Sequence, residues 1–109
     1  MTLEQTLQNE IEESKELLYR PIDNTIYRHD LAKRIEFVSW VVDSMKDPSN
    51  QVCNLIESRM NEITLKIIQI RTIFEADKLY RELNILEWIY NHSIQSSHKS
   101  QSYIEKFDH

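Results

Sequence analysis

The side chains that could do chemistry are scattered along the chain and form no known motif. His92 and His98 lie six residues apart, which is poor spacing for one helix face, and no HExxH or Glu-x-x-His pair accompanies them. Cys53 is the only cysteine, and no histidine is near it in the sequence to activate its thiol. The 18 acidic residues alternate with Lys and Arg, which is typical of a solvated surface. We therefore expect no catalytic residue, no metal site, no cofactor and no enzymatic activity.

One group of basic residues could bind an anionic partner. Arg28, Lys33 and Arg34, with His29 beside them, form a small cluster at the start of the second expected helix. Such a cluster can contact phosphate groups or an acidic protein. The net charge of the chain is −5, so it lacks the broad positive field that underlies most nucleic-acid binding. A nucleic-acid-associated accessory factor that uses these residues is therefore the alternative hypothesis.

The composition indicates an all-α protein with one domain. The 109 residues include no Gly and only two prolines, whereas β-hairpins and phosphate-binding loops usually need Gly for backbone with positive φ. Hydrophobic residues make up 40% of the chain and charged residues 28%, as in soluble helical proteins. No apolar run approaches the roughly 20 residues that span a bilayer. A single cysteine fits a reducing compartment, so we expect a cytoplasmic protein without membrane contact.

The first predicted helix has a clear start and a clear end. Thr2 and Gln5 match a capping box, in which each side chain satisfies a backbone N–H of the other residue. The helix should end near Tyr19 or Arg20, because Pro21 disfavours helical geometry in the residue before it.

The second predicted helix begins after Asp23 or Asn24, either of which can serve as its N-cap. It carries a regular heptad seam formed by Leu31, Ile35, Val38, Val42 and Met45. The pair Asp47-Pro48 ends this helix. Asp47 can then cap the following helix, with Pro48 in its first position.

The third segment is predicted to be one long helix. From residue 49 to residue 92 there is no Pro, no Gly and no run of turn residues. The segment carries two apolar stripes, Val52, Ile56, Met60, Ile63, Ile67, Ile70 and Phe74, and then Leu79, Leu83, Leu86 and Tyr90. The five-residue step from Phe74 to Leu79 either rotates the apolar face within one helix or marks a break near Ala76. Good helix formers at this junction favour the continuous helix.

The length of this third helix argues for self-association. A helix of about 44 residues would span about 66 Å, roughly twice the length of either earlier helix. Its second half would expose large apolar side chains with no partner in the chain, among them Leu79, Leu83, Leu86, Trp88 and Tyr90. A contiguous apolar patch usually marks an interface, so we predict a homo-oligomer, with a dimer favoured. In the alternative, a four-helix bundle with a break near residue 76, the same residues are ordinary core and the chain can be a monomer.

The sequence thus predicts an antiparallel bundle of three main helices with one long C-terminal helix. Residues 1–92 form the helical domain, and residues 93–109 form a polar tail or a short terminal helix. The leading hypothesis is a non-enzymatic protein–protein interaction protein, an adaptor, assembly factor or inhibitor, that self-associates through its long helix. The composition, without Gly and rich in Ile, Asn and Glu, resembles that of small helical phage or plasmid proteins and assembly adaptors.

Overall fold

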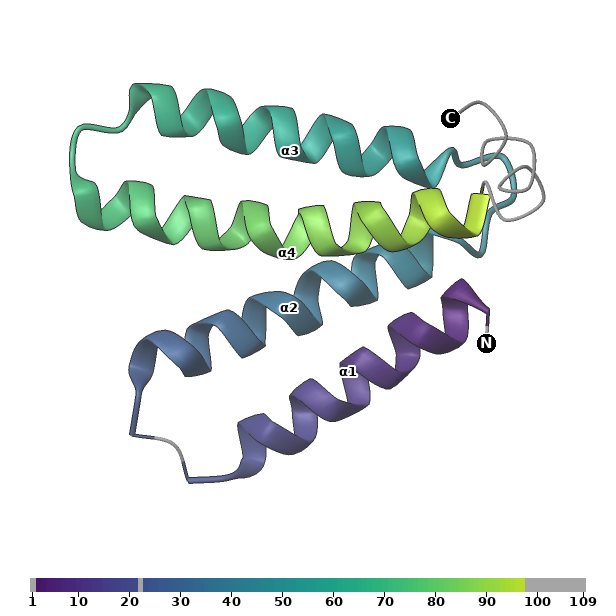
Figure 1. Ribbon diagram of the computed structural model, residues 1–109, viewed down its shortest axis with the longest axis horizontal. Coiled ribbons are helices and arrows are strands. Elements are labelled where there is room, and N and C mark those ends of the chain that lie inside the picture. The colour runs from purple at the N-terminus through teal and green to yellow at the C-terminus, as the bar shows by residue number, and fades with distance from the viewer. Residues whose placement is uncertain (1, 22, 98–109) are drawn as a thin grey trace, which may run out of the picture.

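The protein is a helical bundle, which confirms the predicted all-α class. The computed structural model describes residues 2–21 and 23–97, and these form α1 (Leu3–Tyr19), α2 (Thr25–Ser44), α3 (Val52–Gln69) and α4 (Ile73–Ser97), with no strand. Figure 1 shows two helical hairpins, α1–α2 and α3–α4, with α2 next to α4. The α1–α2 and α3–α4 connections lie at the same end of the bundle, on the left of the view, which we call the hairpin end.

The predicted capping box begins α1. The Thr2 hydroxyl accepts a hydrogen bond from the backbone N–H of Gln5 at 3.2 Å, and the backbone N–H of Thr2 donates to Gln5 Oε1 at 3.0 Å. The helix ends at Tyr19, and Arg20 is extended ahead of Pro21, as the steric restriction before proline requires. Its buried residues are Leu7, Ile11 and Ser14.

The predicted cap of α2 is Asn24, whose side-chain oxygen accepts a hydrogen bond from the backbone N–H of Tyr27 at 3.1 Å. The heptad seam faces the core as expected. Its buried members are Leu31, Val38 and Val42, and its partly buried members are Ile35 and Met45. The helix ends at Ser44, before the Asp47-Pro48 pair.

The prediction that Asp47 caps the next helix is wrong. The Asp47 carboxylate accepts hydrogen bonds from the backbone N–H of Ser49 at 3.0 Å and from the Ser49 hydroxyl at 2.7 Å. These bonds close a local turn, a common competing use of a short acidic side chain. Helix α3 begins only at Val52, and its N-cap residue Gln51 makes no side-chain capping bond.

The predicted long third helix is also wrong, and the four-helix alternative describes the fold. The chain turns at residues 70–72, a few residues before the expected position near 76. Ile70 is extended (φ −81°, ψ 141°), and no described residue has a positive φ, so the turn needs no Gly. Thr72 directly precedes α4. Its hydroxyl accepts from the N–H of Glu75 at 3.3 Å, and its carbonyl accepts from the N–H of Ala76 at 3.1 Å.

One hydrophobic core joins the two hairpins. Helix α1 packs chiefly on α2, and α3 chiefly on α4, while α2 and α4 make the main contact between the hairpins. The core residues are Leu7, Ile11, Phe37, Val38, Val41, Val42, Ile56, Ile63, Ile85, Leu86 and Ile89. Because the chain reverses at residues 70–72, the second half of the predicted long helix supplies part of this core.

Helix α4 continues to Ser97, so the first residues of the predicted polar tail are helical. Residues 98–109, with the short terminal helix expected there, lie outside the described residues. Within 2–21 and 23–97, no helix combines the length and the apolar character needed to cross a bilayer.

Candidate interaction surface

The five residues predicted to form an oligomer interface lie against the core of their own chain. Leu86 is fully buried. The other four are partly buried and pack on the core: Leu79, Leu83, Trp88 and Tyr90. The prediction that nothing within the chain covers these residues is wrong, because the turn brings α4 back along α3 (Figure 1). These residues are explained as bundle core, and they give no reason of their own to expect self-association.

Trp88 illustrates how these side chains are held. The centroid of its ring lies 4.2 Å from that of His92, and the guanidinium carbon of Arg34 lies 6.0 Å from the Trp88 ring centroid. Arg34 also forms an ion pair with Glu10 at 2.8 Å. The cation–π contact thus connects α4 to α2, and the ion pair connects α2 to α1.

Tyr90 connects α4 to α3 through a hydrogen bond from its hydroxyl to the Glu57 carboxylate. This hydrogen bond is the main reason that the pKa of Tyr90 is raised above 10.0, with desolvation and the negative charge of Glu57 acting in the same direction. Cys53, one turn before Glu57, is half-buried.

The predicted basic cluster is engaged within the chain. Arg34 pairs with Glu10, as described above. Lys33 Nζ lies 3.1 Å from the Glu36 carboxylate and 4.0 Å from that of Glu82. Arg28 donates a hydrogen bond at 3.3 Å to the backbone carbonyl of Leu18. Two of the three cations are therefore compensated by carboxylates, which weakens the positive field that the cluster could present to phosphate groups.

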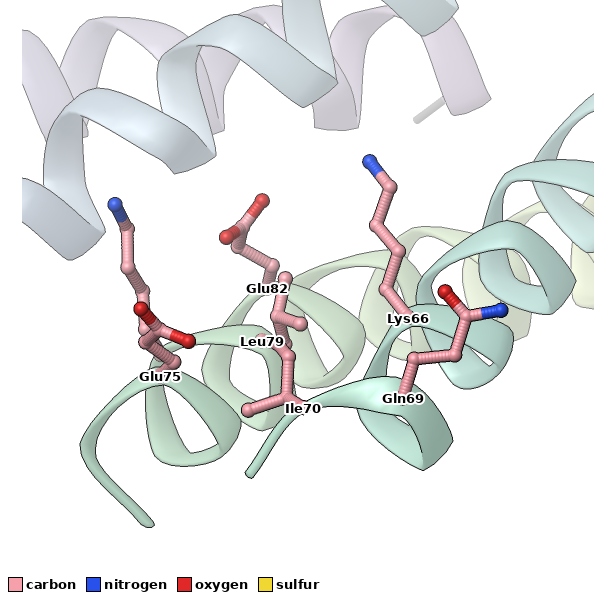
Figure 2. Close-up of a pocket in the computed structure, with 7 residues that line it drawn as sticks. Lys66, Gln69, Ile70, Glu75, Leu79 and Glu82 are labelled. Atoms are coloured by element: carbon pink, nitrogen blue, oxygen red, sulfur yellow. The ribbon is translucent and has the colours of Figure 1, made fainter. Parts of the chain in front are cut away.

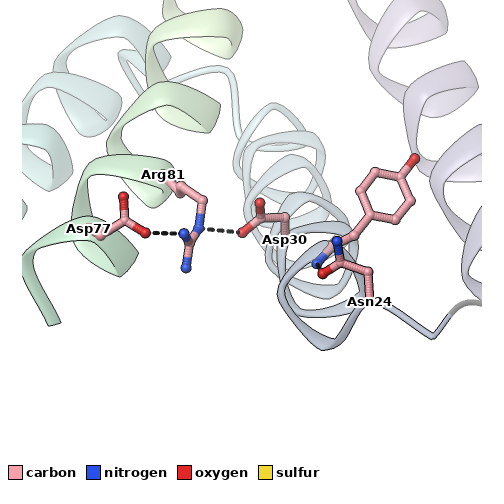
Figure 3. A network of polar contacts seen from close by, with 5 residues as sticks. Asn24, Asp30, Asp77 and Arg81 are labelled. Carbon is pink, nitrogen blue, oxygen red and sulfur yellow. Dashed lines mark hydrogen bonds and ion pairs between the residues drawn. The ribbon is translucent and has the colours of Figure 1, made fainter. Parts of the chain in front are cut away.

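Asp30 and Arg81 hold the two hairpins together. Arg81 Nε donates to Asp30 Oδ1 at 3.1 Å, and a second guanidinium nitrogen of Arg81 bonds Asp77 on the same helix (Figure 3). The Lys33–Glu82 pair is a second ionic link from α2 to α4. The two ionic links between the hairpins thus join the first half of α2 to the first half of α4.

An open cleft of about 480 Å³ lies beside this network. Its lining residues are Lys66, Gln69, Ile70, Glu75, Lys78, Leu79 and Glu82. Figure 2 shows the Lys66 and Glu82 side chains extending from α3 and α4 toward the other hairpin. Leu79 and Ile70 give the cleft an apolar part, and its charged groups carry both signs. The cleft is a groove of mixed charge without a preference for an anionic or a cationic ligand.

Exposed large apolar side chains concentrate toward the hairpin end. Those beside the α1–α2 connection are Tyr19, Ile26 and Tyr27, and those beside the α3–α4 connection are Leu65, Ile68, Ile73 and Phe74, with Tyr80 further along α4. The apolar stripes of the sequence do not reveal these exposed residues. Leu65 and Ile68 fall between the stripe positions of α3, and Phe74 was assigned to that stripe although it belongs to α4. Single exposed apolar residues are ordinary, whereas a group of them at one end is informative.

His29 Nε2 is buried and finds no hydrogen-bond partner among the described residues. Within the part of the chain that the structure describes, no group of three or more His, Cys, Asp and Glu residues could hold a metal ion.

Comparison of the chain with protein-family models, with curated proteins and with solved structures gave no match. Function is therefore inferred from the side chains of this chain and their positions.

Proposed function

We propose that this protein is a non-enzymatic helical interaction protein that binds another protein chain through the apolar side chains of its hairpin end. The observation that supports this is the concentration of large exposed apolar residues there, of which Ile73 is 89% exposed. Keeping such surface in water is unfavourable by about 25 cal/mol per Å², and binding a partner recovers this free energy. Contiguous exposed apolar surface commonly marks a binding site for another macromolecule. An adaptor, an assembly factor or an inhibitor would use such a contact.

The chemistry of this surface favours a protein partner over a nucleic acid. Nucleic-acid binding depends largely on Lys and Arg contacts to phosphates, whereas the hairpin end presents Ile, Leu, Phe and Tyr. Lys33 and Arg34, which the alternative hypothesis requires, already face carboxylates of the same chain. The nucleic-acid hypothesis gains no support from these contacts.

Site-specific photocrosslinking in the cells that make the protein tests the proposal. A photoreactive amino acid at Ile26 or Phe74 should trap a partner protein and give an adduct of defined mass. The same probe at Glu12, an exposed position on α1, is the control and should give no such adduct. Equal labelling from all three positions, or the absence of a protein adduct at both hairpin-end positions, would contradict the proposal.

A further inference from the structure

A second cleft lies at the end of the bundle opposite the hairpin end, where α1 begins, α4 ends and the α2–α3 connection passes (Figure 1). Its volume is about 480 Å³. Leu3 of α1, Met45 directly after α2 and Val52 of α3 give it an apolar lining, and Asn50 and Gln51 add amide groups. No charged residue is among its described lining residues, in contrast to the cleft near the hairpin end. We call this second cleft the end groove.

The first turn of α3 forms one wall of the end groove. Val52, Cys53 and Asn54 line the groove, and the N-cap residue Gln51 makes no side-chain capping bond. The first N–H groups of a helix have no acceptor within the helix, and they favour a negative charge nearby. The end groove therefore combines an apolar lining with backbone donors that Gln51 leaves without a side-chain acceptor.

The segment that follows α4 starts beside the end groove. Ser93 lines the groove, and it lies one turn, about 6 Å along the helix axis, before Ser97, the last residue of α4. The next residues, 98–102, are all polar and can span up to about 17 Å when extended. The residues after this linker can therefore reach the groove without any rearrangement of the bundle.

The residues beyond the linker match the chemistry of the end groove. Tyr103, Ile104 and Phe107 are large and apolar, and their spacing is typical of one face of a helical turn. Glu105 and Asp108 supply the negative charge that a helix N-terminus favours. The same short segment thus carries partners for both the apolar lining and the first turn of α3.

We propose that residues 98–109 bind the end groove of their own chain, with Tyr103, Ile104 and Phe107 on its apolar lining and an acidic side chain at the start of α3. The bound segment covers the thiol of Cys53. A short linker gives an effective concentration of about 1 mM, so an intrinsic Kd of about 0.1 mM keeps the groove occupied about nine-tenths of the time. This inference goes beyond the proposed function, which concerns the opposite end of the bundle.

Alkylation of Cys53 by iodoacetamide in the full chain, followed by mass spectrometry, tests the proposal, because Cys53 is the only cysteine. Ile104→Asp with Phe107→Asp should raise the alkylation rate roughly tenfold, as expected when a thiol covered about nine-tenths of the time becomes free. Ser100→Asp with Ser102→Asp is the matched control, since it adds the same charge to the same segment at polar positions. Its rate should stay close to that of wild type. In concentrated urea all three proteins should react at the same rate.

Backbone amide exchange, followed by NMR, gives a second readout at the start of α3. The N–H groups of Cys53 and Asn54 should exchange roughly tenfold faster in Ile104→Asp with Phe107→Asp than in wild type. The N–H of Tyr27, which Asn24 caps at the start of α2, should exchange equally in both. Phe107→Ser should shift both readouts in the same direction by a smaller factor, and circular dichroism should show unchanged helix content in every variant.

Equal alkylation rates in wild type and in Ile104→Asp with Phe107→Asp would overturn the proposal. An equal acceleration by the serine control would also overturn it, because the effect would then come from charge and not from apolar contact. Protection of Cys53 that decreases on dilution would assign the groove to the segment of a second copy and reject binding within one chain. A hairpin-end photocrosslink is compatible with each of these results, so the two proposals fail separately.

Discussion

Arg81 Nε lies 3.1 Å from Asp30 Oδ1, and this ion pair joins α4 to α2 across the boundary between the two hairpins. The two side chains are only 24% and 32% exposed, so the pair is screened less than a surface pair. We predict that Asp30→Asn lowers the free energy of unfolding by about 1 kcal/mol, measured by urea denaturation. The loss should shrink in 1 M NaCl.

Asp43→Asn is the control for this ion pair. Asp43 pairs with Lys46 at 3.3 Å, but both side chains are mostly exposed. Its substitution should change the free energy of unfolding by less than about 0.5 kcal/mol. Equal effects of the two substitutions would show that the Asp30–Arg81 contact does not link the hairpins.

Leu86→Ala should lower the free energy of unfolding by about 3 kcal/mol, because it leaves a cavity at a fully buried position. Leu65→Ala, at a mostly exposed position, should cost less than about 0.5 kcal/mol in the monomer. Thermal denaturation at several protein concentrations measures the loss of stability in both variants. The loss at Leu86 should not depend on concentration, since its contacts are within one chain. A loss that disappears on dilution would instead place Leu86 between subunits.

Thr72→Ala should cost about 1 kcal/mol, because the Thr72 hydroxyl caps α4 by accepting a hydrogen bond from the N–H of Glu75. Thr64→Ala is the matched control. The Thr64 hydroxyl bonds the Met60 carbonyl within α3, a contact that adds little to helix stability, and Ala has the higher helix propensity. Chemical denaturation should give a lower free energy of unfolding for Thr72→Ala than for Thr64→Ala. Thr72→Ser should keep most of the stability.

The ends of the first two helices could be predicted because their signals are local. The Thr2–Gln5 box, the proline at position 21 and the Asn24 cap each act within a few residues, and no tertiary contact overrides them. The turn at residues 70–72 has a local signal too. Thr72 and Glu75 have the spacing of a capping box, and the Thr72 hydroxyl does cap the helix. A continuous helix was predicted because this segment contains no Gly and no Pro. A turn made of extended backbone requires neither residue.

The exposed apolar surface was harder to predict, for a different physical reason. Leu65 and Ile68 are three residues apart, which is a helical spacing. They do not belong to the buried stripe of α3, however, but lie opposite it or beside it. Which face of a helix is covered depends on where the neighbouring helices lie, and this depends on the position of the turn. Because a continuous helix was predicted, Leu83 and Leu86 were expected on the surface, and no structural role was predicted for Leu65 and Ile68.

Tyr90 should titrate above its ordinary value, because its hydrogen bond to Glu57 raises its pKa above 10.0. A pKa raised in the folded state contributes stability below the unfolded value, and this stability is lost as pH rises through the raised value. Absorbance at the tyrosinate band should show one late step in alkaline titration. Tyr90→Phe should remove this step, and Glu57→Ala should move it to lower pH. An unchanged titration in Glu57→Ala would contradict the hydrogen bond.

The pairing of consecutive helices into hairpins has a consequence for how the chain folds. Most native contacts join segments that are close in the sequence, and such low contact order favours folding in microseconds to milliseconds. Each hairpin can form before the two meet, so the Asp30–Arg81 contact should appear after the main barrier. Asp30→Asn should then speed unfolding and leave the folding rate nearly unchanged in temperature-jump experiments. Docking of two preformed hairpins would be the last event of folding and the first of unfolding.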